Sequence, residues 1–157
     1  QHLSDPEIVA DINATVDFLQ SHQAVNEDRI GVTGFCMGGR VTWLAAASNP
    51  YFKAAAPYYG GNINVIWGGG DKSPFELTEG IKCPVLFHFG EKDINPSAED
   101  MAKFDAELTR LGVEHTFHTY SDADHAFMDY TAQRHNEAAF ELSWLRTLEF
   151  FDTHLKN

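Results

Sequence analysis

The sequence predicts an α/β domain in which a mainly parallel sheet of about four strands carries helices on both faces. Short apolar runs typical of buried strands alternate along the chain with longer segments whose apolar residues recur at helical spacing. One such run, residues 84–89, is apolar throughout except for His88, as in a parallel strand that is buried on both faces. Because the chain has 157 residues, residues 1–157 are expected to form a single domain.

The N-terminal half is predicted to contain two helices, each of which is followed by a strand. The first helix should begin at Ser4, since Ser4 and Glu7 have capping-box spacing and Pro6 suits a first turn. Its apolar face is formed by Ile8, Ile12, Val16 and Leu19. The elements expected next are a strand at 29–33, a helix at 40–47, a strand at 53–59 and a Gly- and Asn-rich loop at 60–74.

The C-terminal half is predicted to continue the same alternation. After the strand at 84–89, a helix should run from its cap at Ser97 to its end at Gly112, with Met101, Phe104, Leu108 and Leu111 on its apolar face. Residues 114–120 form the last strand. The final helix carries one apolar stripe, made of Phe140, Trp144, Leu148, Phe151 and Leu155.

A short motif lies between the strand at 29–33 and the helix at 40–47. It reads Gly34-Phe35-Cys36-Met37-Gly38, the G-x-C-x-G form of a nucleophile elbow with Cys in place of Ser. Gly34 and Gly38 are expected because so tight a turn leaves no room for a Cβ atom at either flank. At the N-terminus of a helix, the macrodipole would stabilise Cys36 as a thiolate. The alternative is a buried structural Cys in a tight turn.

A thiol nucleophile needs a base, and the base needs a group that orients it. Asp93 follows the third predicted strand and His125 follows the fourth, so both lie at the carboxyl ends of strands, where open parallel sheets place their sites. Glu91 and Asp71 are weaker candidates for the acid. Taken singly, an Asp in a turn is more often a backbone cap and a lone His a surface or core residue. Their order and placement after Cys36 favour catalysis.

The remaining Cys and His residues have structural interpretations. His88 alternates with core phenylalanines and is expected to be a core histidine with satisfied nitrogens. His115 and His118 should point to opposite faces of their strand, so no metal site is predicted there. Cys83 is expected to be a small buried apolar residue.

Composition excludes several classes of function. The net charge of −12 argues against nucleic-acid binding and against attraction to anionic membrane surfaces. No apolar run approaches the ~18 residues of a membrane-spanning helix, and the N-terminus has no signal-peptide pattern. Two Cys do not make a disulfide framework, and a free nucleophilic thiol requires a reducing compartment, so a cytoplasmic location is expected.

The sequence resembles the dienelactone hydrolase family. The matching segments span nearly the whole chain and are 34–40, Tyr58-Tyr59-Gly60, 81–86, 90–93 and Asp124-His125-Ala126-Phe127. The resemblance implies the triad Cys36, Asp93 and His125, and hydrolysis of small lactones or esters without a cofactor or metal. The family sheet has further strands before the elbow, so the fold expected here is a truncated α/β-hydrolase, the C-terminal portion only.

The resemblance also implies how substrate would be held. The backbone N–H of Met37 is expected to stabilise the oxyanion, whereas the second N–H usually comes from a loop that precedes the elbow strand in the fold. The candidate substrate-pocket residues are Phe35, Tyr59, Phe127 and Asp129. Lactonase-type members carry an Arg at the position of Asp129, whose carboxylate would repel an anionic substrate.

Two hypotheses about function follow. In the first, the chain hydrolyses a small-molecule ester or lactone through a thioester of Cys36. In the second, it is a non-catalytic remnant of a hydrolase that acts as a binding or assembly module. In either case residues 30–33 would form an unprotected sheet edge, which predicts a homodimer or higher homo-oligomer.

Overall fold

A computed structural model describes residues 3–156 of the chain. Four strands form one sheet in the order β1-β2-β3-β4, and each pairs with its neighbour in parallel. The strands are β1 (Gly31–Phe35), β2 (Ala54–Tyr58), β3 (Val85–Gly90) and β4 (His115–Tyr120). This sheet confirms the predicted fold class, and the strand bounds differ from the predicted ones by only a residue or two.

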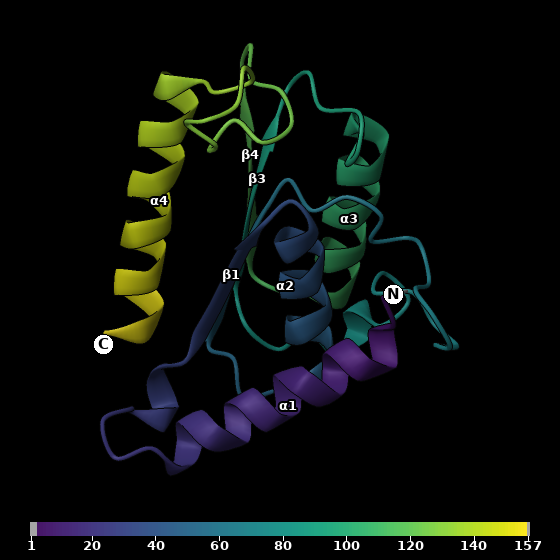
Figure 1. Ribbon diagram of the computed structural model, residues 1–157, viewed down its shortest axis with the longest axis vertical. Helices are drawn as coiled ribbons and strands as arrows, with labels where there is room; N and C mark the ends of the chain where they lie inside the picture. Colours follow the sequence, from purple (N-terminus) through teal and green to yellow (C-terminus); the bar gives the residue numbers. More distant parts are fainter. Residues whose placement is uncertain (1–2, 157) are drawn as a thin grey trace.

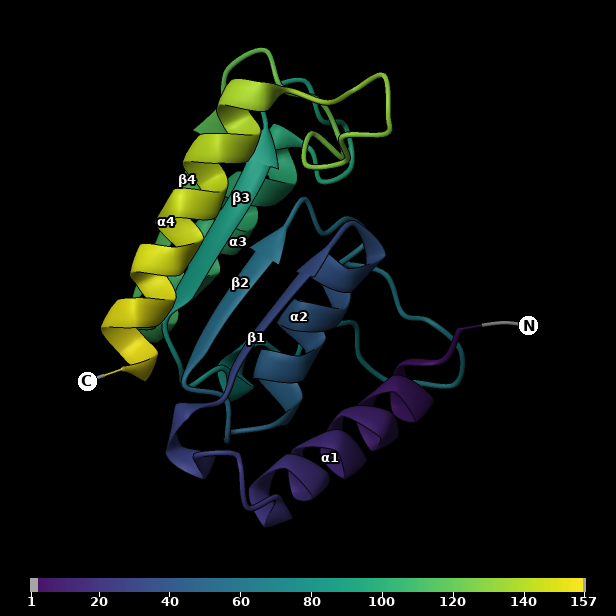
Figure 2. The same cartoon turned by 60° about the vertical axis from the view of Figure 1, so that its left-hand side comes forward.

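Helices lie on both faces of the sheet, as predicted (Figure 1). They are α1 (Asp5–Ser21), α2 (Met37–Ser48), α3 (Ala98–Leu111) and α4 (Glu137–Leu155), with short 3₁₀ turns η1 (Glu27–Arg29) and η2 (Thr78–Gly80). α4 covers one face, α2 and α3 cover the other, and α1 crosses beside α2 (Figure 2). This layering leaves the carboxyl ends of all strands, and the loops that follow them, at one end of the molecule.

The main apolar core lies between the sheet and helices α2 and α3. Trp43 of α2 packs against Phe87 of β3 and Phe104 of α3, with ring centroids 6.1 and 5.3 Å apart. All three side chains are almost completely buried. Aromatic contacts of this kind stabilise a core beyond the area they bury, so the elbow helix is firmly anchored on the sheet.

The start of α1 differs from the prediction. Ser4 is the N-cap residue, but its side chain makes no capping hydrogen bond, so the expected capping box with Glu7 is absent. Instead Asp5 is buried and accepts two hydrogen bonds from the guanidinium of Arg40, at 2.7 and 2.9 Å, and a third from the backbone N–H of Trp67 at 2.9 Å. This fully buried pair joins α1 to the elbow helix. At α3, Ser97 does form a capping box, and Gly112 ends the helix with φ 68°.

The face that α4 buries is not its apolar stripe. Ala139, Ser143 and Thr147 are buried on the sheet, whereas Trp144 and Leu148 are 40% and 47% exposed. The reason is that α4 docks through hydrogen bonds rather than through an apolar face. The stripe is turned toward β1 and past its free edge, where the lower end of the helix packs against Gly31.

Those hydrogen bonds form one continuous chain between the sheet and α4. Tyr58 donates to the carbonyl of Ser143 at 3.0 Å and bonds to Thr147 Oγ1 at 2.5 Å. His88 bonds to the same Thr147 oxygen at 2.9 Å through Nε2 and to the Tyr120 hydroxyl at 2.8 Å through Nδ1. Buried polar groups are stable only when paired in this way.

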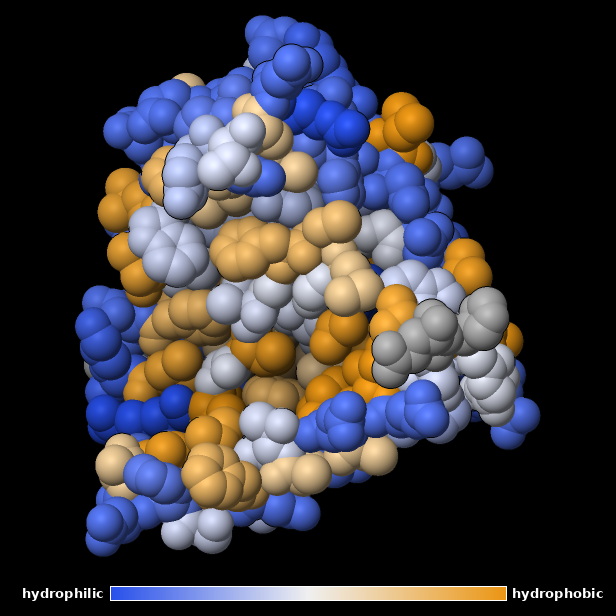
Figure 3. Space-filling view, viewed as in Figure 1, coloured by the Kyte–Doolittle hydropathy of each residue, from blue (hydrophilic) through white to orange (hydrophobic). Residues whose placement is uncertain are grey.

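β1 is an edge strand, as the sequence predicts. Beside it, a groove of about 610 Å³ runs between α1, β1 and α2 and is lined mainly by apolar side chains, among them Ile8, Ile12, Leu19, Val32, Met37 and Val41. Apolar residues gather between α1 and the strand above it in the space-filling view (Figure 3). With the exposed stripe of α4 on the opposite face, both sides of this edge are apolar.

Candidate active site

The turn between β1 and α2 has the geometry of a nucleophile elbow. Cys36 has φ 56° and ψ −118°, a strained conformation for a residue with a side chain. Its N–H donates to the carbonyl of Tyr58 at 3.1 Å, and its carbonyl accepts from the N–H groups of Gly39 and Arg40. The side chain is exposed, so the turn presents the thiol to solvent rather than burying it in the core.

Glycine is required for steric reasons at Gly34, as predicted, and at Gly39 rather than at Gly38. A Cβ atom on Gly34 would lie 2.3 Å from the carbonyl oxygen of Gly38, so Gly34 is required, as expected. A Cβ on Gly38 would meet no atom of the described residues 3–156 within 4 Å, so the expectation for Gly38 was wrong. The second close approach is at Gly39, where a Cβ would lie 2.3 Å from the carbonyl oxygen of Tyr58.

The structure brings together the three residues that the sequence singles out. His125 lies 2.9 Å from Asp93 Oδ2 through Nδ1, and 3.0 Å from Cys36 Sγ through Nε2. Asp93 is 7% exposed, and its other oxygen accepts from the N–H of Asn95 at 2.9 Å. Glu91 instead accepts from the N–H of Asp122, and Asp71 lies exposed in the loop at 60–74. Only Asp93 among the predicted acids therefore contacts the imidazole.

The charge state of His125 follows from these contacts. The hydrogen bond to Asp93 raises the pKa of His125 to about 9, with a smaller contribution from Cys36, while partial burial acts in the opposite direction. At neutral pH the ring is therefore an imidazolium that donates from Nδ1 to Asp93 and from Nε2 to the sulfur. Because Cys36 is the N-cap residue of α2, a thiolate there also lies at the positive end of the helix dipole. Met37 is the first residue of α2, and the N–H groups of a first turn have no acceptor within their own helix.

Three of the four predicted pocket residues line one cavity beside the triad. This cavity, called here the aromatic pocket, has a volume of about 410 Å³ and is lined by Phe35, Tyr59, Asp129, Tyr130, Phe140 and Trp144, with Met128. The expectation for Phe127 was wrong, since it is fully buried and packs beneath Tyr59 with centroids 5.2 Å apart. Tyr130 was missed because nothing local in the sequence distinguishes it. Phe140 and Trp144 were assigned to the α4 stripe.

A second cavity is lined by the imidazole itself. It has a volume of about 480 Å³, and its lining consists of His125 and Asp93 together with Lys92, Ile94, Asn95, Asp124 and Arg134. This lining carries charges of both signs. His125 therefore borders a polar cavity, while Tyr59, which packs against its ring, lines the aromatic pocket.

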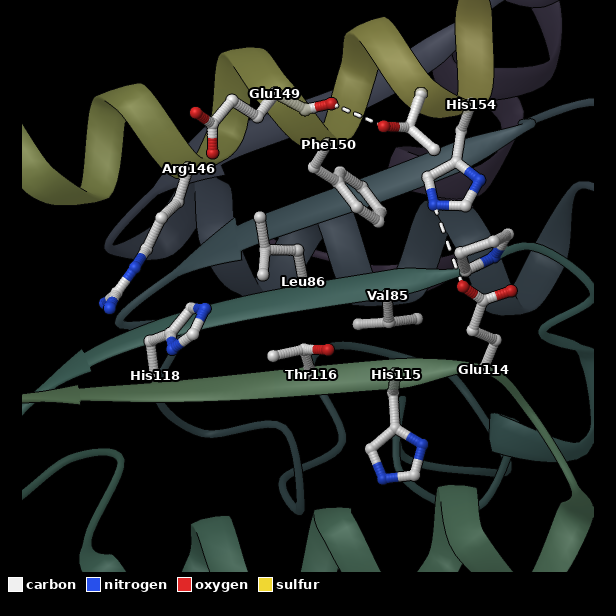
Figure 4. Close-up of a pocket in the computed structure, with 12 residues that line it drawn as sticks. Val85, Leu86, Glu114, His115, Thr116, His118, Arg146, Glu149, Phe150 and His154 are labelled. Atoms are coloured by element: carbon white, nitrogen blue, oxygen red, sulfur yellow. Dashed lines mark hydrogen bonds and ion pairs between the residues drawn. The ribbon is translucent and has the colours of Figure 1, made fainter.

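His88, His115 and His118 lie away from this site, whereas His2 is outside the described residues. Burial lowers the pKa of His88 to about 3, so this core residue is neutral. His118 points toward α4 and Arg146, whereas His115 points to the opposite side of β4 (Figure 4). Within residues 3–156 no group of His, Cys, Asp and Glu side chains is placed to hold a metal ion. Cys83 is 5% exposed, and burial raises the pKa of its thiol to about 11.

Among residues 3–156, no helix combines the length and the apolar character needed to cross a bilayer.

The chain is similar in sequence to proteins of one hydrolase family. The model of the dienelactone hydrolase family matches residues 1–155. A protein of Synechocystis sp. named "Putative carboxymethylenebutenolidase" is 33% identical over 154 residues, which are 98% of this chain and 62% of the relative. A protein of Bradyrhizobium sp. named "Probable 2-oxo-3-(5-oxofuran-2-ylidene)propanoate lactonase" is 30% identical over 156 residues, again 98% of this chain and 62% of the relative.

The fold is also similar to that of a solved structure from the same family. The crystal structure titled "Putative Dienelactone Hydrolase from Klebsiella pneumoniae" superposes with a TM-score of 0.83 and 29% identity, over 94% of this chain and 61% of that one. The chain thus spans about three fifths of the length of these similar proteins, with 62% and 61% covered.

Proposed function

The chain belongs to the dienelactone hydrolase family, and from this premise we propose that it hydrolyses an ester or lactone bond of a small molecule. Cys36 is the nucleophile, His125 moves the protons, and Asp93 orients His125. The observation that carries the proposal is the unbroken contact from Asp93 through His125 to Cys36, at 2.9 and 3.0 Å. Nucleophile, base and orienter in contact are the general signature of covalent catalysis.

The proposed acylation begins from the ion pair of Cys36 and His125. The sulfur of Cys36 attacks the acyl carbon, an S–C bond forms, and the carbonyl electrons move to oxygen. When the tetrahedral intermediate collapses, the C–O bond to the alcohol breaks, and His125 gives its Nε2 proton to the leaving oxygen. The product is a thioester on Cys36 and a neutral imidazole. Asp93 remains ionised throughout and stabilises the imidazolium.

Deacylation restores the starting state. Neutral His125 accepts a proton from water, and the resulting hydroxide attacks the thioester carbon. The C–S bond then breaks, the carboxylic acid leaves, and the thiolate and imidazolium are regenerated. Neither step requires a cofactor or a metal. Both intermediates carry an oxyanion, for which we assign the backbone N–H of Met37 as a donor. An oxyanion donor of this kind typically contributes about 10²–10³ in rate.

The surroundings of the triad favour substrates that are not anionic. Asp129 lines the aromatic pocket, and the net charge of −12 disfavours anions at long range. The same charge argues against nucleic acid as a partner. Because the mechanism needs a free thiol, a reducing compartment such as the cytoplasm suits the enzyme.

A second candidate, a non-catalytic binding or assembly module, is favoured by the free edge of β1. The groove beside α1 and the part of the α4 stripe outside the aromatic pocket, at Leu148, expose apolar side chains on the two sides of this edge. Such edges pair readily with other chains, so we propose that the chain forms a homodimer or higher homo-oligomer through them. Assembly is compatible with catalysis and becomes the main function only if the triad is inactive.

Hydrolysis of p-nitrophenyl acetate distinguishes the two candidates. We expect the wild type to release p-nitrophenol with a burst that corresponds to the thioester, and Cys36→Ala to lose this activity. Cys83→Ala is the matched control, because it removes the other thiol and should retain the activity. A wild type that is no faster than Cys36→Ala, with both folded by circular dichroism, would leave assembly as the function.

A further inference from the structure

The aromatic pocket has a composition suited to one class of ligand. Five of its lining side chains are aromatic, and its charged residue is a carboxylate, Asp129. No Lys or Arg belongs to the lining among the described residues. The faces of aromatic rings carry negative potential and attract cations, most strongly when several rings surround the charge. The volume of about 410 Å³ is that of a small-molecule site.

The pocket is next to the reacting residues, because two of its lining residues adjoin them. Phe35 precedes Cys36 in the chain. Tyr59 packs edge-on against the imidazole of His125 with ring centroids 5.1 Å apart, and its ring centroid lies 6.3 Å from that of Phe35. A substrate with its acyl carbon at Cys36 would therefore extend a substituent into the pocket.

Asp129 is held as an anion at the pocket. Its Oδ1 accepts from the N–H and the hydroxyl of Thr131, at 2.9 and 2.6 Å, and these bonds hold the pKa of Asp129 below its ordinary value. His135 lies near enough to lower this pKa a little further, but its Nε2 is bonded to Glu137 at 2.7 Å. The carboxylate is therefore available to a positive group in the pocket.

We propose that the aromatic pocket binds an alkylammonium group of the substrate, so that the preferred substrates are small esters whose acyl or alcohol part carries a quaternary or protonated amine. The inference rests on the proposed hydrolase function and supplies its substrate class. Rings and carboxylate act together: the rings cover the methyl groups of the cation and Asp129 balances its charge. A neutral group of equal size would gain only the apolar contact.

Binding is tested first, without any reaction, by calorimetric titration with tetramethylammonium chloride at low ionic strength. Wild type should bind it and should bind tert-butanol, a neutral compound of similar size, at least about tenfold more weakly. Asp129→Asn should weaken tetramethylammonium binding without changing that of tert-butanol, and Trp144→Leu should weaken it further by removing a ring. Glu141→Gln, an exposed change on the same helix outside the pocket, should have no effect. Equal binding of the two compounds by wild type would overturn the proposal.

Turnover is tested with a matched pair of esters, acetylcholine and its uncharged carbon analogue 3,3-dimethylbutyl acetate. We expect kcat/KM to favour acetylcholine at least about tenfold in wild type, and Asp129→Asn to lower this ratio while the rings keep it above one. Hydrolysis that depends on Cys36, with a ratio near one and no cation binding, would overturn this inference and leave the hydrolase function intact. Cation binding without hydrolysis of any ester would support the cation site and overturn the proposed hydrolase function.

Discussion

Nε2 of His125 lies 3.0 Å from the sulfur of Cys36, although 89 residues separate the two in the chain. The contact exists because β1 and β4 are parallel strands of one sheet, so the loops after them open at the same end. A thiol and an imidazole at this distance exchange a proton without any large movement of either side chain.

Cys36 should be by far the more reactive of the two thiols. It is exposed beside an imidazolium, whereas Cys83 is buried and the pKa of its thiol is raised to about 11. Iodoacetamide at neutral pH should therefore label Cys36 at least about tenfold faster, as measured by peptide mass spectrometry. Cys36→Ala should abolish the fast phase. Equal rates at the two residues would contradict the assignment of the elbow.

The stability of the triad should depend on pH in a defined window. The folded pKa of His125, about 9, lies above its ordinary value of 6.5. The pair with Asp93 therefore contributes its full stability below about pH 6.5 and loses it as the pH rises through about 9. The difference in Tm between wild type and Asp93→Asn should be largest near pH 6 and shrink toward pH 10.

Two controls accompany that measurement. Asp122→Asn removes an exposed ion pair with Lys92 in a neighbouring loop and should show no such window. Asp93→Asn should also lower kcat by about 10² or more, because an unoriented base transfers protons poorly. A pH-independent difference in Tm would mean that His125 is not charged in the folded protein.

Glycine substitutions at the two flanks of the elbow should have unequal effects. A methyl group at Gly34 would lie 2.3 Å from a backbone oxygen, so Gly34→Ala should lower the free energy of unfolding by about 2 kcal/mol or more. Gly38→Ala meets no atom of the described residues within 4 Å and lies in α2, where Ala is the better helix former. It should be neutral or stabilising by up to about 1 kcal/mol in urea denaturation. Equal losses would show that the elbow is built differently.

Reversing the charge at Asp129 should change substrate preference. Asp129→Arg should raise kcat/KM for a carboxylate-bearing lactone relative to a neutral ester by about fivefold or more, roughly the value of one exposed charge pair. Asp129→Asn should give an intermediate ratio. An unchanged ratio in competition assays would place Asp129 outside the substrate site.

Assembly should depend on the apolar surfaces at the free edge of β1. Leu148 is 47% exposed on the α4 stripe, so Leu148→Lys should shift the chain from oligomer toward monomer in light scattering at micromolar concentration. Ile94→Lys is the control, because Ile94 is 88% exposed in a loop away from this edge. A wild type that is a stable monomer would exclude the proposed oligomer.

The sequence predicts most of this fold because its signals are local. Apolar periodicity located each strand and helix, and the elbow motif with Asp93 and His125 after later strands located three residues that the structure brings into contact. What it could not predict are pairings between distant polar residues. Nothing near Asp5 indicates that it pairs with Arg40 of another helix.

The same limit explains the errors in side-chain burial. Phe127 is apolar and follows His125 closely, but whether it lines or underlies the pocket depends on packing against Tyr59 and Tyr120. For α4, the apolar stripe does not reveal the buried face, because Thr147 finds hydrogen-bond partners on two different strands.

The hydrogen bonds under α4 have a consequence for substrate selection. An apolar interface tolerates small slides, but a shift of α4 by one turn, about 5.4 Å, would break the bonds of Thr147 to Tyr58 and to Nε2 of His88, and His88 would keep only its bond to Tyr120. The helix therefore has a single translational register on the sheet. Phe140 and Trp144 are fixed by that register, so the width of the cavity they line is determined by hydrogen bonds on the far side of the helix.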